Sequence, residues 1–503
     1  MRLPIGIQDF THLREENYVY VDKTMLIQPL LEGGRFFLSR PRRFGKSLLL
    51  STIKAVFQGR KDLFTGLWLE HHHDFVPHPI IRMDFSNINF TTKTLDEGIV
   101  DWLRIVALET GYTITSSNAR DAFRELILEL SKSKKIVVLI DEYDKPITDT
   151  LLEPEKRNIN QATLKSVYGV LKPMDASLHL VLLTGVSKIG KLSLFSDLNN
   201  LQDISLNSSY NTLCGYTKEE IEFAFVGQLE VLRQTMALTQ TELMQLITTW
   251  YNGYSWDGLT RVYCPFSFLL FLEQKEFKSY WYETATPTFL LELIRAAKLN
   301  PLEFDHVVLD SMAVASTNPD KINPTSLMFQ TGYLTITKKR PSPLGTIYEL
   351  AYPNQEVRVA FSSNLVEEYT QQPIGSFAIF MQEALNNLDW EKFFGICNQV
   401  FAGVPYEIFP KQESYVHSLM HLMLTSTGYK TQSQVQTSKG RMDTLVTTSS
   451  QSIIFEFKTK GTAKAALKQI DTARYADSLL KPVLKVGVVF NLEQKVITGW
   501  AVG

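Results

Sequence analysis

The stretch RFFLSRPRRFGKSLLLSTIKAVF, residues 35–57, decides the fold of the first part of the chain. Its apolar start predicts a strand, its apolar end predicts a helix, and Gly45-Lys46-Ser47 lies at the junction. Such a loop directs backbone N–H groups at phosphate, while the lysine contacts the terminal phosphates and the serine coordinates Mg²⁺. The tripeptide also occurs by chance, and Arg40 replaces the usual first glycine of a Walker A loop, so a second signal is needed.

The second signal is KKIVVLIDEYDKPI, residues 134–147, in which five consecutive apolar residues end at Asp141 and Glu142. A buried parallel strand that delivers an acid at its carboxyl end is how a Walker B site holds Mg²⁺. Glu142 would orient the attacking water, with Asp144 as the competing candidate. The two signals together predict a P-loop nucleotide-binding domain.

Weaker signals surround this pair. The strand-like run HLVLLTGVSKI, residues 179–189, places Thr184 and Ser187 where a polar side chain could contact the γ-phosphate. Arg42 and Arg43 could reach phosphates, although solvated surface charge is the alternative for both.

Strands and helices alternate over residues 1–214, which predicts an α/β domain with a mainly parallel sheet. Residues 215–404 read as a helical region, opening at the N-cap Thr217 and including a winged-helix-like unit. Residues 405–503 read as a third domain.

Composition sets few further limits. The chain has 503 residues, 44% of them hydrophobic and 21% charged, which fits several globular domains. A net charge of −2 leaves nucleic-acid binding to a local patch. Three scattered cysteines and no apolar run of signal or membrane length predict a cytoplasmic protein without a membrane partner.

The third domain carries GRMDTLVTTSSQSIIFEFKTK, residues 440–460. Alternation along a strand puts Glu456 and Lys458 on one face, and pairing with the preceding strand brings them beside Asp443. Two carboxylates can bind Mg²⁺ at a scissile phosphate, and the lysine can position water. An exposed salt-bridging edge strand is the alternative. With a strand placed near 429–435, the element order αβββαβ favours a restriction-endonuclease-like domain.

Several motifs together resemble the bacterial AAA-ATPase-like domain proteins: YVYVDKT, SRPRRFGKS, LIDEYDKPI, LLTGVSKI, WYNGYSW and PFSFLLFL. That family commonly carries a C-terminal PD-(D/E)xK nuclease domain. The resemblance implies ATP as the nucleotide, an arginine-rich loop in which Arg40 is normal, and a place near the nucleotide for Tyr20, Asp22 and Lys23. It leaves WYNGYSW without a derived role, and we assign this segment to packing.

Resemblance to the nuclease superfamily adds Glu413 as a metal-binding acid and Gln469 as a residue near the site. Tyr475 matches less well, because it lies six residues after Gln469 rather than four. His71, His72 and His73 are assigned to a solvated loop.

The candidate residues follow from these readings. The expected catalytic residues are Glu142, Asp443, Glu456, Lys458 and Gln469. The expected nucleotide-binding residues are Tyr20, Lys23, Arg42, Arg43, Phe44, Gly45, Lys46, Ser47, Asp141 and Ser187. The expected metal ligands are Ser47, Asp141, Glu413, Asp443 and Glu456.

The sequence therefore predicts an ATP-binding and hydrolysing P-loop protein coupled to a Mg²⁺-dependent nuclease that acts on nucleic acid, with DNA preferred. The alternative is a nucleotide-switched signalling protein, or a toxin or defence effector, whose nuclease-like domain is inactive. Homo-oligomerisation stays open.

Overall fold

The computed structural model describes residues 2–196, 198–285, 288–297, 299–315, 317–343, 345–404, 412–437, 440–448, 450–473, 475, 479 and 481–503. The chain forms two compact units. One comprises Met1–Trp281 and Val308–Asn354, and the other comprises Tyr282–Val307 and Gln355–Gly503.

A parallel sheet forms the centre of the first unit, with the strand order β2-β3-β4-β1-β5. In that order the strands are Ile80–Asp84, Ile136–Asp141, Leu178–Gly185, Gly34–Ser39 and Gln202–Asp203. Every residue of β3 is buried, as expected for a strand covered on both faces. The predicted parallel α/β sheet is therefore confirmed; the short β5 was not predicted.

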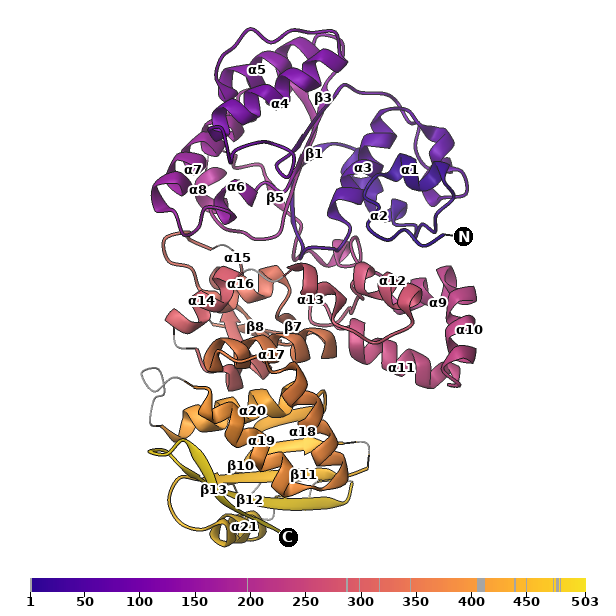
Figure 1. The fold of residues 1–503 in the computed structure, drawn as a ribbon. Helices are drawn as coiled ribbons and strands as arrows, with labels where there is room; N and C mark the ends of the chain where they lie inside the picture. Colours follow the sequence, from indigo (N-terminus) through magenta and orange to yellow (C-terminus); the bar gives the residue numbers. More distant parts are fainter. Residues whose placement is uncertain are drawn as a thin grey trace. The chain divides into compact units, whose positions relative to one another are not determined.

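Helices cover both faces of this sheet (Figure 1). Helix α3 (Lys46–Phe57) packs with α1 (Phe10–Glu15) on one side, and α4 (Leu95–Glu109), α5 (Ala119–Leu130) and α7 (Pro154–Tyr168) group on the other. The strand order puts β4 between β1 and β3, so the loops that follow these three strands lie at one edge of the sheet. A crevice at the carboxyl ends of parallel strands is where ligands bind in such folds.

A helical segment follows the parallel sheet in the Met1–Trp281 part of the first unit. It contains α9 (Lys218–Ala224), α10 (Val226–Thr235), α11 (Gln240–Tyr251) and α12 (Pro265–Gln274), which share one apolar core. Thr217 caps α9 and forms a capping box with Glu220, which confirms the predicted helix start.

Residues 308–354 add a small sheet of order β6-β8-β7, formed by Val307–Asp310, Gly345–Ala351 and Thr335–Ser342. Helices α15 (Ser311–Ala315) and α16 (Pro324–Thr331) precede its hairpin of β7 and β8. The first unit also contains α2 (Thr24–Leu31), α6 (Lys145–Thr148) and α8 (Lys191–Leu194), while α13 (Tyr280–Ala285) begins in the first unit and α14 (Thr288–Ala296) belongs to the second.

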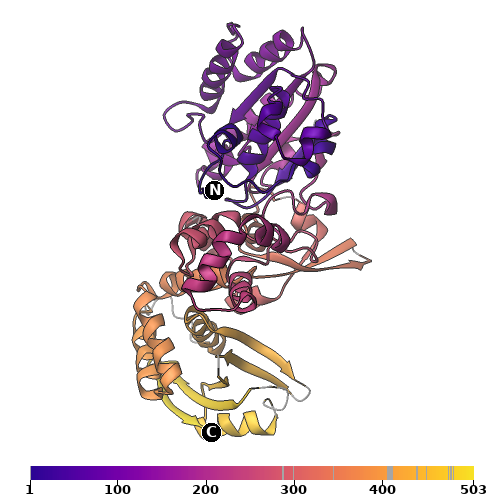
Figure 2. The ribbon, with the colours of Figure 1, turned by 90° about the vertical axis from the view of Figure 1, so that its right-hand side faces the viewer.

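The second unit is built on a mixed sheet of order β13-β12-β11-β10-β9. In chain order its strands are β9 (Lys430–Thr437), β10 (Gly440–Thr447), β11 (Ser452–Lys458), β12 (Val483–Asn491) and β13 (Val496–Val502). Helices α18 (Gly375–Asn387), α19 (Trp390–Ala402) and α20 (Glu413–Ser426) lie on one side and α21 (Ala463–Thr472) on the other (Figures 1 and 2). Helix α17 (Gln355–Thr370) packs on α20.

The predicted order of helix, three strands, helix and strand is present in this unit, and β13 extends it beyond the prediction. Across the described part of the chain, no helix combines the length and the apolar character needed to cross a bilayer.

Candidate functional site

The phosphate-loop residues lie at the start of α3, directly after β1. Lys46 and Ser47 open the helix, and Gly45 before them has φ 88°. A Cβ built at Gly45 would meet no described atom within 4 Å, so the left-handed backbone rather than crowding calls for glycine. Arg43 is also left-handed, at φ 69°. The loop is therefore the strained turn that a strand–loop–helix phosphate site needs.

Lys46 is almost fully buried, and its Nζ donates to the carbonyl oxygens of Arg40 and Pro41, both at 2.9 Å. Burial lowers the pKa of Lys46, and the nearby carboxylates of Asp141 and Glu142 oppose that shift. The ammonium group is thus held inside the loop by neutral acceptors. A phosphate could replace them without leaving a buried donor unpaired.

Arg40 turns its guanidinium away from that position. It is fully buried, donates to the carbonyl oxygens of Ser205 at 2.7 Å and Tyr210 at 3.0 Å, and lies 3.9 Å from the Trp256 ring centroid. The side chain that replaces the usual glycine therefore anchors the loop from behind.

The aromatic segment around Trp256 supports the same loop. Phe44 packs edge-on against Tyr254 at 4.7 Å and against Trp256 at 5.8 Å between ring centroids, and it is only 1% exposed. Its ring is consequently not available to a nucleotide base, and only its backbone faces the loop. The assignment of this segment to packing is confirmed, and the partner of that packing is the phosphate loop.

Asp141 ends β3 beside β4. Thr184 Oγ1 donates to Asp141 Oδ1 at 2.6 Å, while Oδ2 is buried without a hydrogen-bond partner among the described residues. A buried carboxylate oxygen left unpaired is costly unless it accepts a further partner. The position therefore fits a Mg²⁺ ligand, as the sequence predicts.

The next two acids differ sharply. Glu142 has the left-handed φ of 52°, and burial raises the pKa of its carboxyl. Asp144 accepts hydrogen bonds from the N–H of Val186 at 3.2 Å and from the N–H and Oγ of Ser187 at 2.7 and 2.6 Å. Asp144 is thus committed to the loop after β4, which favours Glu142 as the residue that orients water.

The other expected nucleotide residues are spread more widely. Tyr20 packs edge-on against Phe10, and burial raises the pKa of its phenol, which a hydrogen bond with Thr52 of α3 opposes. Lys23 Nζ contacts both carboxylate oxygens of Glu220, at 2.6 and 2.5 Å. Asp22 accepts from the N–H groups of Thr24 and Trp68. Arg42 and Arg43 are exposed, and the Arg43 guanidinium lies 4.7 Å from the Phe266 ring centroid.

His71 and His72 are exposed, as expected for a solvated loop. With His73, His78 and His179 they line an open pocket of about 650 Å³. Among the described residues, no three His, Cys, Asp or Glu side chains are already grouped tightly enough to hold a metal ion.

In the second unit, β10 and β11 are antiparallel, with Thr444 opposite Phe455. That register, continued by one residue, sets Asp443 opposite Glu456. Asp443 Oδ2 accepts the Phe457 N–H at 2.9 Å, and Lys458 Nζ lies 3.2 Å from Glu456 Oε1. The structure therefore brings together the two carboxylates and the lysine that the sequence picked out.

This cluster is electrostatically strained. Glu456 is 1% exposed, and burial together with the neighbouring Asp443 raises its pKa to about 7. Burial also raises the pKa of Asp443, while His417 and Lys458 oppose that shift. In the described chain Glu456 Oε2 has no hydrogen-bond partner. A buried and a half-buried carboxylate, one of them with an unpaired oxygen, are a donor set suited to a hard divalent cation.

His417 lies beside this cluster, and sequence reasoning did not single it out. Its Nε2 lies 3.8 Å from Glu413 Oε1 and 3.9 Å from Asp443 Oδ2, and this nitrogen is buried without a hydrogen-bond partner within the described residues. The available signal was its spacing, four residues after Glu413 on the same helix face. Glu413 itself accepts from Thr459 Oγ1 at 2.5 Å.

Two further expected residues lie elsewhere in this unit. Gln469 is on α21, and no hydrogen bond among the described residues joins its side chain to Asp443, Glu456 or Lys458. Tyr475 is buried in an apolar cluster with Met442, Leu445, Ile454 and Ile470.

Two protein families match the chain, one at each end, and a known protein matches it over its full length. The family described as Predicted AAA-ATPase matches residues 4–195, and the PD-(D/E)XK nuclease superfamily matches residues 411–500. A protein of Azotobacter chroococcum mcd 1, named "Uncharacterized protein in vnfD 5'region", is 35% identical over 519 residues, covering 100% of this chain and 98% of that protein.

A solved structure, that of the Aeropyrum pernix ORC2 protein in ADPNP and ADP complexes, covers 86% of this chain and 88% of its own, at 13% identity. Its TM-score of 0.24 is too low to carry an argument. The family matches instead agree with the two sites described above. The chain therefore belongs to the predicted AAA-ATPase family and ends in a domain of the PD-(D/E)XK nuclease superfamily.

Proposed function

We propose that this protein binds and hydrolyses ATP in its first unit and cleaves nucleic acid, preferentially DNA, in its second. We assign the activities to residues 1–214 and 405–503, with residues 215–404 between them. One observation carries the proposal: each unit has a buried strand that carries, at or near its end, a carboxylate with one oxygen lacking a described partner. The carboxylate is Asp141, near Lys46, in the first unit and Glu456, near Lys458, in the second.

In the first unit, Lys46 would release the carbonyl oxygens of Arg40 and Pro41 and neutralise the terminal phosphates. Ser47 and Asp141 would hold Mg²⁺, which supplies charge stabilisation to the transferred phosphoryl group. Glu142 would orient the attacking water, because its raised pKa makes it a better proton acceptor than an ordinary surface glutamate.

In the second unit, Asp443, Glu456, Glu413 and His417 would hold a divalent cation, which would supply Lewis-acid stabilisation of the scissile phosphate. Lys458 would position water beside that phosphate. Since Glu456 binds a cation only as a carboxylate, cation affinity should increase as the pH rises through about 7.

The test is cleavage of single- and double-stranded DNA and RNA by the full chain with Mg²⁺, with and without ATP. Asp443→Asn should abolish cleavage but leave ATP hydrolysis intact. Glu391→Gln, an exposed change in the same unit, should leave both activities unchanged. Lys46→Ala should remove ATP hydrolysis and alter cleavage. Absence of cleavage on every substrate, with ATP hydrolysis intact, would refute the nuclease half of the proposal.

A further inference from the structure

The loop of residues 186–190, which follows β4, receives contacts from three directions. From the end of β3, Asp144 accepts the Ser187 N–H at 2.7 Å and the Ser187 Oγ–H at 2.6 Å. Tyr143 is fully buried, and its hydroxyl donates to the Ser187 carbonyl oxygen at 3.0 Å. The loop is therefore fixed to the segment that carries Asp141 and Glu142.

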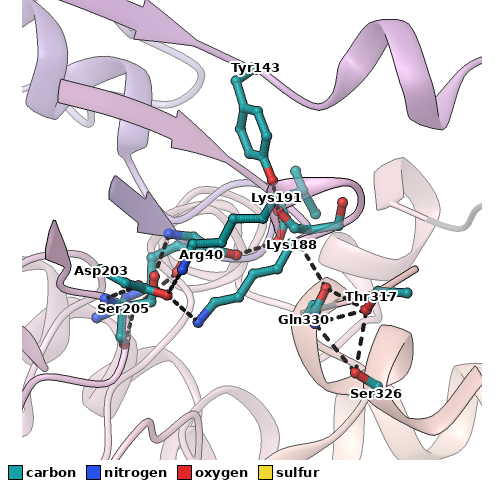
Figure 3. Close-up of polar contacts among 12 residues, drawn as sticks. Arg40, Tyr143, Lys188, Lys191, Asp203, Ser205, Thr317, Ser326 and Gln330 are labelled. Carbon is teal, nitrogen blue, oxygen red and sulfur yellow. Dashed lines mark hydrogen bonds and ion pairs between the residues drawn. The ribbon is translucent and has the colours of Figure 1, made fainter. Parts of the chain in front are cut away.

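The second direction is the phosphate loop. Ser39 Oγ donates to the carbonyl oxygen of Val186 at 2.7 Å. Lys188 is 3% exposed, and its Nζ donates to Asp203 at 2.8 Å. Figure 3 shows that Asp203 also contacts Lys191, and that Ser205, next to Asp203, contacts Arg40. The phosphate loop is therefore joined to residues 186–190 through buried polar contacts.

The third direction is the segment 308–354, and its main contact is Gln330 on α16. Gln330 Oε1 accepts the Lys188 N–H at 2.7 Å, while Nε2 donates to Thr317 Oγ1 at 3.2 Å and Ser326 Oγ at 3.3 Å (Figure 3). The Gly190 N–H also donates to the Thr317 carbonyl oxygen at 3.0 Å. Gln330 is 4% exposed, so water cannot readily replace these bonds.

We infer that Gln330 is a positioning residue: it holds the 186–190 loop against Asp144 and links the nucleotide site to residues 308–354. The inference rests on the proposed ATPase function. Phosphate binding must draw Lys46 away from the carbonyl oxygens of Arg40 and Pro41, and Arg40 is joined through Ser205 and Asp203 to Lys188. The chain enters this segment from Val307 and leaves it at Gln355, both of which belong to the second unit.

The test compares Gln330→Met with Thr331→Val. Methionine keeps the length and volume of the side chain but removes its hydrogen bonds. Thr331 follows Gln330 directly, and its hydroxyl bonds within its own helix, to the Leu327 carbonyl oxygen at 2.6 Å. We expect Gln330→Met to lower kcat for ATP hydrolysis roughly 10- to 100-fold with KM within about twofold, and Thr331→Val to change neither.

A second readout does not depend on catalysis. Hydrogen exchange of the backbone amides in residues 317–330 should slow on Mg²⁺–ATP binding in the wild type and in Thr331→Val, but not in Gln330→Met. A double-mutant cycle with Ser187→Ala should give non-additive effects on kcat, because both changes act on the same loop. If Gln330→Met fails to fold, Ser326→Ala removes one of the two acceptors of Gln330 Nε2, together with its own bond to the Ala313 carbonyl oxygen, and should produce a smaller effect in the same direction.

The outcomes separate the two levels of the argument. A wild type that binds no nucleotide would overturn the proposed ATPase function and this inference together. A wild type that binds and hydrolyses ATP, with Gln330→Met indistinguishable from Thr331→Val in kcat and in exchange, would overturn only the role of Gln330.

Discussion

Glu456→Gln should make the metal-free protein more stable at alkaline pH, although it removes a residue proposed to bind the catalytic cation. The Glu456 carboxyl is buried, and its pKa is about 7 in the folded protein against an ordinary value of 4.5. The folded state therefore holds this proton more tightly than the unfolded state. The resulting stabilisation is complete below pH 4.5 and is lost as the pH rises through about 7. Glutamine imitates the protonated form at every pH.

The magnitude follows from the pKa difference. Since one pKa unit corresponds to about 1.4 kcal/mol, the interval between 4.5 and about 7 gives an upper limit of about 3 kcal/mol. Solvent reaches the neighbouring Lys458, which is 28% exposed, so we expect about half of this limit. For a unit of this size, that is a gain of roughly 3–6 °C in Tm.

The assay is thermal denaturation of the full chain in EDTA at pH 5, 6, 7 and 8, with Glu391→Gln as an exposed control in the same unit. The difference in Tm between Glu456→Gln and wild type should be positive but smallest at pH 5, where about a quarter of the full effect is present, and should reach its largest value at pH 8. Added Mg²⁺ should raise the Tm of the wild type at pH 8 but not that of the variant. Equal Tm values at all pH values, or a variant less stable at pH 8, would refute the assignment of a buried, proton-binding carboxylate.

Three further predictions concern single residues. Glu142→Gln should keep ATP affinity within about threefold but reduce hydrolysis at least about 100-fold, measured by equilibrium binding and phosphate release. His417→Ala should raise the Mg²⁺ concentration needed for half-maximal cleavage by about 10- to 100-fold, and an unchanged Mg²⁺ titration would contradict its place in the site. Arg40→Gly, which restores the usual glycine, should lower the free energy of unfolding by at least about 3 kcal/mol in chemical denaturation, because it removes buried charge-assisted hydrogen bonds.

The sequence predicted the parts of both sites that local pattern determines. An apolar run ending in an acid identifies Asp141, because a buried parallel strand and its carboxyl-end acid are adjacent in sequence. Strand alternation likewise places Glu456 and Lys458 on one face, and the contact between them confirms it. Helix starts such as that at Thr217 depend on neighbouring residues only and were predicted equally well.

Residues whose roles depend on distant partners could not be assigned in this way. Gln330 and Lys188 are 142 positions apart, and nothing in the sequence around either residue indicates that they are in contact. Asp144 was a reasonable catalytic candidate until its carboxylate was found to bond the loop after β4. His417 was not singled out from the sequence, because its position near Asp443 appears only in the folded chain.

Arg40 replaces the usual first glycine of the Walker A loop, and its contacts in the folded chain decide whether this replacement argues against a phosphate site. A side chain at this position would block the phosphate only if it pointed into the loop, whereas the Arg40 guanidinium points to Trp256 and to the carbonyl oxygens of Ser205 and Tyr210. Its backbone carbonyl still faces Lys46 Nζ, at 2.9 Å. The Arg40 side chain thus leaves the surroundings of Lys46 Nζ open, and its guanidinium fixes the loop to the carbonyl oxygens of Ser205 and Tyr210. The aromatic segment around Trp256 follows from the same logic, because an arginine buried without a carboxylate in contact needs a π face and carbonyl oxygens to replace its lost hydration.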